Sequence, residues 1–381
     1  MLRTILVLMS LVIGVLIANR HPSTRVVFRW LPVPLWCYVL PMLARSFGWL
    51  PEQSTVYRTL TEHFLPFALA LLLLEVDVPS LQRVGDRALV AASVGAAGIV
   101  FGAGVMFLAL QKILGPESWK GVATLVGTWT GGSLNLLALR SLLNTPDGIV
   151  APLIVVDTMV AYSGMALWVA VSGFQKPIDK WLRAKPLVIP EVTSASSDSA
   201  QRGWRAWLLC VCCALGLTLI STNLAMRLPT HTLISSASGW TILLVTTGSL
   251  LLSFLPRVRQ CGTQASFLGY PCLYVVLAAT GAQASLQAFA SSPQWLLLGL
   301  GIVVIHGGLL ILAGRLLRLP VGLLATASQA NIGGVVSSPL VGAVYHRSLA
   351  PVGLVLALAG NALGTYFGLF SAWLCQRWLM S

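Results

Sequence analysis

The sequence predicts an all-α polytopic membrane protein built from two related halves. Only 9% of its 381 residues are charged and 56% are hydrophobic, whereas soluble domains carry about 25% charged residues. Apolar runs of the roughly 20 residues that a span requires recur along the whole chain. A third observation, a set of features repeated in the same order on both sides of a hydrophilic segment, predicts the two halves.

Twelve apolar ranges are candidate membrane spans. They are 4–18, 33–50, 62–78, 88–111, 119–142, 148–174, 205–222, 236–256, 265–282, 294–316, 318–345 and 349–375. The first range is short for a full crossing and follows Arg3. It is typical either of a retained first span, which we favour, or of the charged and apolar regions of a signal peptide.

The one long hydrophilic segment, residues 175–204, is a Ser-rich linker by composition. It separates a first half with the N-terminal span (1–174) from a second half (205–381). Lys and Arg gather there and in short loops, which favours a cytoplasmic linker. The net charge of +13 therefore fits contact with the lipid bilayer, and we expect no nucleic-acid partner because no basic run is interleaved with aromatic residues.

The two halves repeat four features in the same order. A motif over 64–81 parallels one over 267–286, and each is followed by a Gly-containing span. A span centred on a Gly-Gly pair comes next, and then a last long span that begins at Ala-Pro, near residues 151 and 350. Internal repeats are a known construction principle of secondary transporters.

Both Gly-Gly pairs lie near the middle of a span, where a lipid-facing helix should be most apolar. Each glycine lowers helix propensity by about 1 kcal/mol, and broken backbone at this depth is tolerated only beside protein or a wet cavity. Gly-interrupted segments at matching positions of two halves indicate a substrate site; close helix packing by small residues is the alternative. The candidate residues are Thr128, Thr130, Gly131, Gly132, Ser133, Asn135, Ser328, Gln329, Asn331, Gly333 and Gly334.

Asp157 lies well inside the span that follows the first Gly-Gly pair, roughly 12 Å from its start at helical rise. A charged carboxylate near the midplane is costly unless it is protonated, cation-bound or facing water. The position suits a proton or sodium coupling site; a structural acid bonded to a neighbouring helix is the alternative. Asn361 lies at comparable depth in the second half and could bind a ligand or hold two helices together.

Other polar residues have more ordinary interpretations. His306, in the middle of a span, could relay protons, although a structural hydrogen-bonded histidine is the commoner case. Glu75 and Asp77 precede Pro79 at a span end and suit capping or ion pairing at the interface. Arg140 and Arg315 are expected to extend from span ends to the headgroups.

The sequence predicts no enzyme, metal site or cofactor. It has no P-loop, Rossmann fingerprint, H-E-x-x-H or G-x-S-x-G motif. Cys210 and Cys213 form a C-x-x-C pair inside an apolar span, without a second pair or a histidine at zinc-ligand spacing. The one bound species that we expect besides the substrate is a coupling ion, H⁺ or Na⁺.

These motifs resemble domain-of-unknown-function family 819, whose members are bacterial and plant-plastid membrane proteins. The resemblance spans about 33–375 and rests on residues 71–77, 127–135, 327–334 and 360–368, with Asp157 and His306. The family pattern has Pro where Val335 stands and favours Asn where Gln329 stands.

That family in turn resembles the superfamily of cation/proton antiporters, bile-acid symporters and other anion carriers. This resemblance implies inverted repeats and a core domain with two crossed discontinuous helices, moving against a second domain. Asp157 would then belong to the acidic coupling helix, and the polar residues around both Gly-Gly pairs would line the crossing. Twelve spans would make the halves parallel, so inversion requires that one candidate, such as 205–222 or 236–256, does not cross, or that another crossing exists.

We therefore expect a carrier in a bacterial inner membrane that moves a small ion or organic anion by alternating access. A membrane scaffold that kept a transporter fold without transport is the first rival. An intramembrane enzyme using Asp157 and His306 is the second. Whether the chain forms a homodimer stays open.

Overall fold

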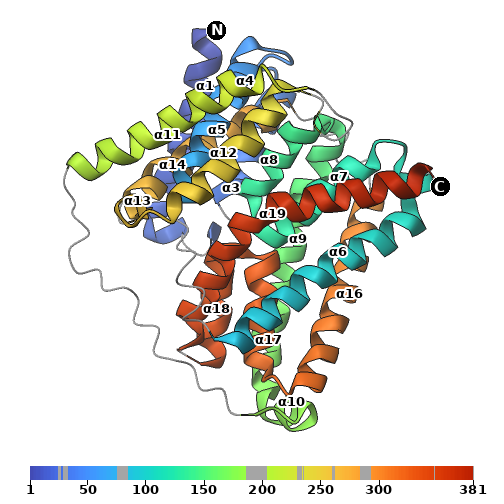
Figure 1. Cartoon of the computed structure of the whole chain (residues 1–381). Coiled ribbons are helices and arrows are strands. Elements are labelled where there is room, and N and C mark those ends of the chain that lie inside the picture. Colours follow the sequence, from blue (N-terminus) through green and yellow to red (C-terminus); the bar gives the residue numbers. More distant parts are fainter. Residues whose placement is uncertain are drawn as a thin grey trace. The chain divides into compact units, whose positions relative to one another are not determined.

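The computed structural model describes residues 1–24, 27–28, 33–74, 85–185, 204–229, 234, 236–259, 262–283, 293–346 and 348–380. Within these ranges the chain forms helices joined by short turns, with no strand (Figure 1). Two compact units emerge, and each combines segments from both halves of the sequence. These units are groups of helices that contact one another, whereas the predicted halves are repeats in the sequence. The division into halves therefore stays a prediction.

The first unit comprises 1–75, 140–158 and 203–295. Its central helix α5 packs against α14, α12 and α11, and α3 packs against α14 and α1. Nearly every residue of α5 is buried, as expected for a helix that is apolar all round. The helices are α1 (Leu2–Arg20), η1 (Pro22–Thr24), α3 (Val33–Ser46), α4 (Thr55–Thr59), η2 (Leu60–Phe64), α5 (Leu65–Leu74), α11 (Trp204–Ala225), α12 (Ala237–Ser253), α13 (Pro256–Arg259) and α14 (Gly262–Gly281).

The second unit comprises 76–139, 159–202 and 296–381. Its long helix α19 packs against α7, α18, α17 and α6 (Figure 1). The helices are α6 (Asp86–Leu114), α7 (Ser118–Gly131), η4 (Ser172–Phe174), α10 (Gln175–Leu182), α16 (Gln294–Leu317), α17 (Val321–Ile332), α18 (Gly334–Tyr345) and α19 (Leu349–Met380). Two further helices contribute to both units: α8 (Ser133–Leu143) and α9 (Asp147–Val171).

Each predicted span overlaps a helix, and the two Gly-Gly spans each form two helices. In the described part of the chain, six helices are long and apolar enough to cross a membrane: α1, α6, α9 with its extension to Leu182, α11, α16 and α19. Large apolar side chains are exposed along them, such as Leu219 at 62% and Val304 at 73%. Such side chains suit contact with lipid tails rather than water.

The start of the predicted linker is helical instead of irregular. Residues 175–182 form α10, which packs against α17, and the Asp179 carboxylate accepts a hydrogen bond from the Val321 N–H at 2.7 Å. Composition misses α10 because a helix this short depends on tertiary contacts for its stability. At the end of α16, Arg315 donates to the Trp181 carbonyl and lies over its ring, 5.6 Å from the centroid.

Glu75 and Asp77, expected at a span end, lie outside the described residues, as does the rest of the linker from 186 to 203.

Candidate functional site

The first helix break separates α7 from α8 at one residue. α7 ends at Gly131, α8 begins at Ser133, and Gly132 between them has a backbone φ of +75°. Residues with a side chain rarely adopt this left-handed conformation, so glycine fits the break. The Gly132 N–H still bonds to the Thr128 carbonyl at 2.5 Å. The chain therefore changes direction abruptly after a regular helix end.

The Asn135 side chain holds this break closed. Its Nδ2 donates to the Gly131 carbonyl at 2.5 Å and to the Asn361 carbonyl at 3.1 Å. Its Oδ1 accepts from the Thr365 hydroxyl at 2.6 Å. Asn135 is only 1% exposed. One buried amide thus joins both sides of the break to α19 with its hydrogen-bonding groups paired.

The second break separates α17 from α18 at a Gly-Gly pair. α17 ends at Ile332, Gly333 has an ordinary φ of −104°, and Gly334 has a φ of +72°. The Ser338 hydroxyl donates to the Thr326 carbonyl at 2.9 Å, which ties α18 back to α17. Both Gly-Gly spans therefore contain a left-handed residue, and it is the second glycine of each pair.

Helix α19 contacts both breaks through glycines. A Cβ atom built on Gly360 would lie 2.5 Å from the Thr130 carbonyl oxygen and 3.8 Å from that of Ala330. A Cβ on Gly353 would lie 2.6 Å from the Ser338 hydroxyl. Small residues permit this close approach of backbones. Residues just before the first break and just before the second therefore meet beside one helix of the second unit.

His306 ties α17 to α6 and is 1% exposed. Its Nδ1 lies 2.9 Å from the Gly95 carbonyl oxygen, and its Nε2 lies 3.0 Å from the Ser328 hydroxyl. A carbonyl only accepts, so Nδ1 carries the proton, and in the neutral ring Nε2 accepts from Ser328. Asn331 adds a hydrogen bond of 3.1 Å to the Ala92 carbonyl. Whether His306 also relays protons stays a prediction.

The polar residues predicted around both breaks belong to the second unit. Those that are buried are Thr128, Thr130, Gly131, Asn135, Ser328, Gln329, Asn331 and Gly334. Those that are half-buried are Gly132, Ser133, Gly333 and Asn361. Asp157 is partly buried and belongs to the first unit. Its participation in the same site stays a prediction.

Two polar residues at the breaks were not predicted as site residues. Ser337 is buried, and it stands third after its Gly-Gly pair, as Asn135 does after the first pair. Thr365 follows Asn361 by one helical turn. Matching positions across the repeat would have identified Ser337, and helical periodicity would have identified Thr365.

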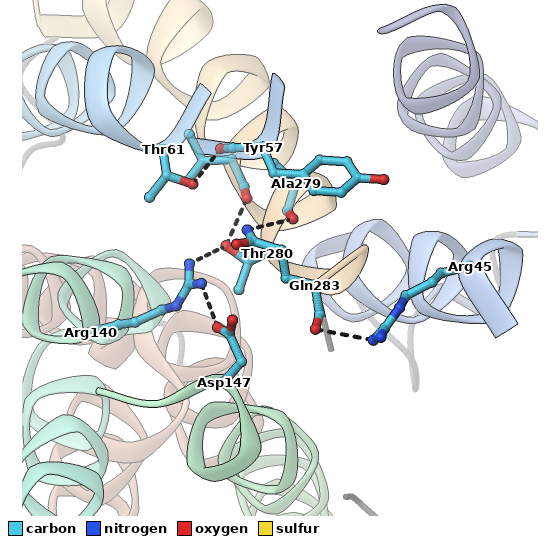
Figure 2. A network of polar contacts seen from close by, with 9 residues as sticks. Arg45, Tyr57, Thr61, Arg140, Asp147, Ala279, Thr280 and Gln283 are labelled. Carbon is cyan, nitrogen blue, oxygen red and sulfur yellow. Dashed lines mark hydrogen bonds and ion pairs between the residues drawn. The ribbon is translucent and has the colours of Figure 1, made fainter. Parts of the chain in front are cut away.

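Arg140 does not extend to the headgroups as expected. It is only 9% exposed, and in the first unit it donates to the Asp147 carboxylate at 2.5 Å and to the Thr280 hydroxyl at 2.8 Å (Figure 2). Nearby, Arg45 donates to the Gln283 carbonyl at 3.2 Å (Figure 2). Arg140 therefore pairs with groups inside the protein instead of with lipid headgroups. These contacts join the ends of α8 and α9 to α14.

These helices and exposed apolar surfaces define a polytopic integral membrane protein. Over residues 5–377 the chain matches the family model described as "Protein of unknown function (DUF819)", and it belongs to that family. It is similar to the "Uncharacterized membrane protein YjcL" of Bacillus subtilis (strain 168), with 24% identity over 348 residues that cover 86% of each chain.

Proposed function

We propose that the protein is a secondary carrier that moves a small ion or organic anion by alternating access. The observation that carries this proposal is the meeting of two helix breaks beside α19, each with a left-handed glycine and buried uncharged polar residues. Irregular backbone at membrane depth requires surrounding protein or a water-filled cavity. Paired breaks of this kind form the binding sites of transporters with repeated halves.

In this proposed carrier, the two broken spans are the crossed discontinuous helices of inverted repeats. The second unit, which holds both breaks, is then the candidate core domain. Its helix ends offer a ligand two kinds of group, carbonyls from α7 and α17 and N–H groups from α8 and α18. Such ends suit cations and anions respectively, so one site of this type is able to take an ion together with an organic anion.

Coupling is assigned to Asp157, the eleventh residue of the 25-residue helix α9. No Asp or Glu follows Asp198 in the sequence, so the second half supplies no alternative carboxylate. Protonation and cation binding compete for one carboxylate at membrane depth, which is the property a coupling residue needs. We place the protein in a bacterial inner membrane, with no enzymatic activity and no resident cofactor.

A ligand screen of the purified protein tests this function. Melting temperatures are measured with sodium, lithium and potassium, at several pH values, and with a panel of carboxylates and amino acids. A ligand at about one hundred times its dissociation constant stabilises by about 2.7 kcal/mol. Hits are then tested for uptake into proteoliposomes, beside the variant Asp157→Asn.

Saturable stabilisation and uptake, with uptake lost in Asp157→Asn, is the expected result. No stabilisation and no uptake of any compound by a folded wild type would instead favour a membrane scaffold. Turnover of a membrane-soluble compound, lost in both Asp157→Asn and His306→Gln, would favour an intramembrane enzyme.

A further inference from the structure

Two buried oxygen atoms at the second break lack partners. In the part of the chain that the structure describes, neither Gln329 Oε1 nor Ser337 Oγ has a hydrogen bond, although the two residues are 1% and 4% exposed. Both atoms face Gly333: a Cβ built there would lie 1.9 Å from Ser337 Oγ and 2.4 Å from Gln329 Oε1. A buried polar atom without a partner costs about 1–3 kcal/mol. The absence of a Cβ at Gly333 therefore lets two uncompensated oxygens lie against its backbone.

At the first break, a different group lies beside the equivalent glycine. When the Gly-Gly pairs are aligned, Gly131 corresponds to Gly333 and Asn135 to Ser337. A Cβ built on Gly131 would lie 2.2 Å from Asn135 Nδ2, the amide nitrogen that donates to two carbonyls. A positively polarised N–H group thus occupies the first break. The second break has the Gln329 Oε1 acceptor and the Ser337 hydroxyl in the same place, and neither has a hydrogen bond.

We propose that Gln329 Oε1 and Ser337 Oγ are ligands of a monovalent cation, with sodium as the probe, bound beside Gly333 in the break between α17 and α18. This inference deepens the proposed carrier function, on which it rests, by naming Gln329 and Ser337 as ligands of the transported or coupling cation. The Gln329 carbonyl already accepts from the Gly333 N–H at 2.9 Å, and the carbonyls that follow it at the end of α17 are the further neutral oxygens available to the cation.

The charge of the site selects the class of cation. Of the helices that pack against α17, α7, α18 and α19 contain no Asp or Glu, whereas α6 begins at Asp86 and α10 holds Asp179, whose carboxylate already accepts from the Val321 N–H at the start of α17. Divalent ions such as Ca²⁺ and Mg²⁺ bind through carboxylates, and α17 and α18, which form the break, supply none. Amide, hydroxyl and carbonyl oxygens instead replace the hydration shell of a singly charged ion, as rings of backbone carbonyls do in potassium channels.

The test measures how sodium stabilises the purified full chain in detergent. Sodium chloride replaces choline chloride at constant ionic strength and pH 8, and the melting temperature gives the half-saturating sodium concentration. Ser337→Ala removes one ligand and should raise that concentration about tenfold or more, the usual loss when a metal site is disturbed. Ser338→Ala is the matched control, because the Ser338 hydroxyl already bonds to the Thr326 carbonyl. It should leave the half-saturating concentration unchanged.

A second variant acts in the opposite direction. Gln329→Glu places a carboxylate oxygen at the same point, so it should lower the half-saturating sodium concentration at pH 8 and lose that gain in acid. It keeps the test decisive if Ser337→Ala does not fold.

The inference is overturned if the melting temperature of the wild type does not change with sodium. It is also overturned if Ser337→Ala and the wild type have the same half-saturating sodium concentration. A change in stability of Ser337→Ala without sodium dependence also overturns it, because the oxygens then hold only a buried water. Uptake that depends on Asp157 but not on sodium overturns this inference and leaves the carrier function. Sodium stabilisation lost in Ser337→Ala, without uptake of any compound, supports the site and rejects the carrier.

Discussion

The two helix breaks differ in what surrounds their first glycine. Beside Gly131, the nearest atoms of α19 are backbone: a Cβ built there would lie 2.6 Å from the Gly360 carbonyl oxygen and 2.8 Å from Gly364 Cα. Beside Gly333, the nearest atoms all belong to the side chains of Gln329 and Ser337. A helix backbone cannot yield without moving the whole helix, whereas the end of a side chain rotates.

This difference separates a fixed break from an adaptable one. At the first break Asn135 pairs its own amide groups and holds α8 against α19. At the second break the oxygens of Gln329 and Ser337 stay available. A carrier needs both properties, because a binding site must be positioned by rigid elements and still respond to its ligand. For the proposed carrier, we therefore expect the first break to position the binding site and the second break to respond to the ligand.

The largest expected effect comes from adding one methyl group to each first glycine. Gly131→Ala pushes a Cβ into the α19 backbone and should destabilise by about 3 kcal/mol, the upper range for overpacking. Gly333→Ala meets movable side chains and should cost about 1 kcal/mol, while abolishing sodium stabilisation. Melting temperatures with and without sodium measure both.

Gly307→Ala on α16, where a Cβ meets nothing within 4 Å, controls for the general effect of alanine in a helix. Equal destabilisation by Gly131→Ala and Gly333→Ala would show that the two breaks are equally rigid.

A smaller effect is expected from the polar residue that follows each pair. Asn135→Leu keeps the approximate size but leaves the Gly131 and Asn361 carbonyls and the Thr365 hydroxyl without their present partner. This should cost about 2 kcal/mol. Ser337→Ala removes a buried atom that has no partner and with it the cost of about 1–3 kcal/mol, so without sodium it should not lower stability.

Thr365→Val, which removes one of the three hydrogen bonds of Asn135, should fall between these two variants in melting temperature. A Ser337→Ala variant as unstable as Asn135→Leu in sodium-free buffer would mean that the Ser337 hydroxyl is structural.

The sequence was sufficient to predict a helix in every apolar span and the positions of both breaks, although not the short helix α10. Paired glycines in apolar spans are a local signal, and the left-handed Gly132 and Gly334 lie within them. The contacts that distinguish the breaks could not be predicted, because they depend on α19, more than 200 residues from Asn135 in the chain. The same holds for Arg140, whose partner Thr280 comes from a distant helix.

The smallest expected destabilisation is at the second glycine of each pair, where a substitution isolates the backbone cost of the break. A Cβ on Gly334 would meet nothing within 4 Å, so Gly334→Ala should carry only the left-handed penalty of about 1 kcal/mol. Gly334→Asn should cost less, because asparagine tolerates this conformation better than alanine. Gly132→Ala should cost more than Gly334→Ala, since its Cβ would also lie 3.2 Å from Asn361 Oδ1. Melting temperatures in sodium-free buffer rank the three variants, and a Gly334→Asn variant no more stable than Gly334→Ala would show that backbone conformation is not what glycine provides there.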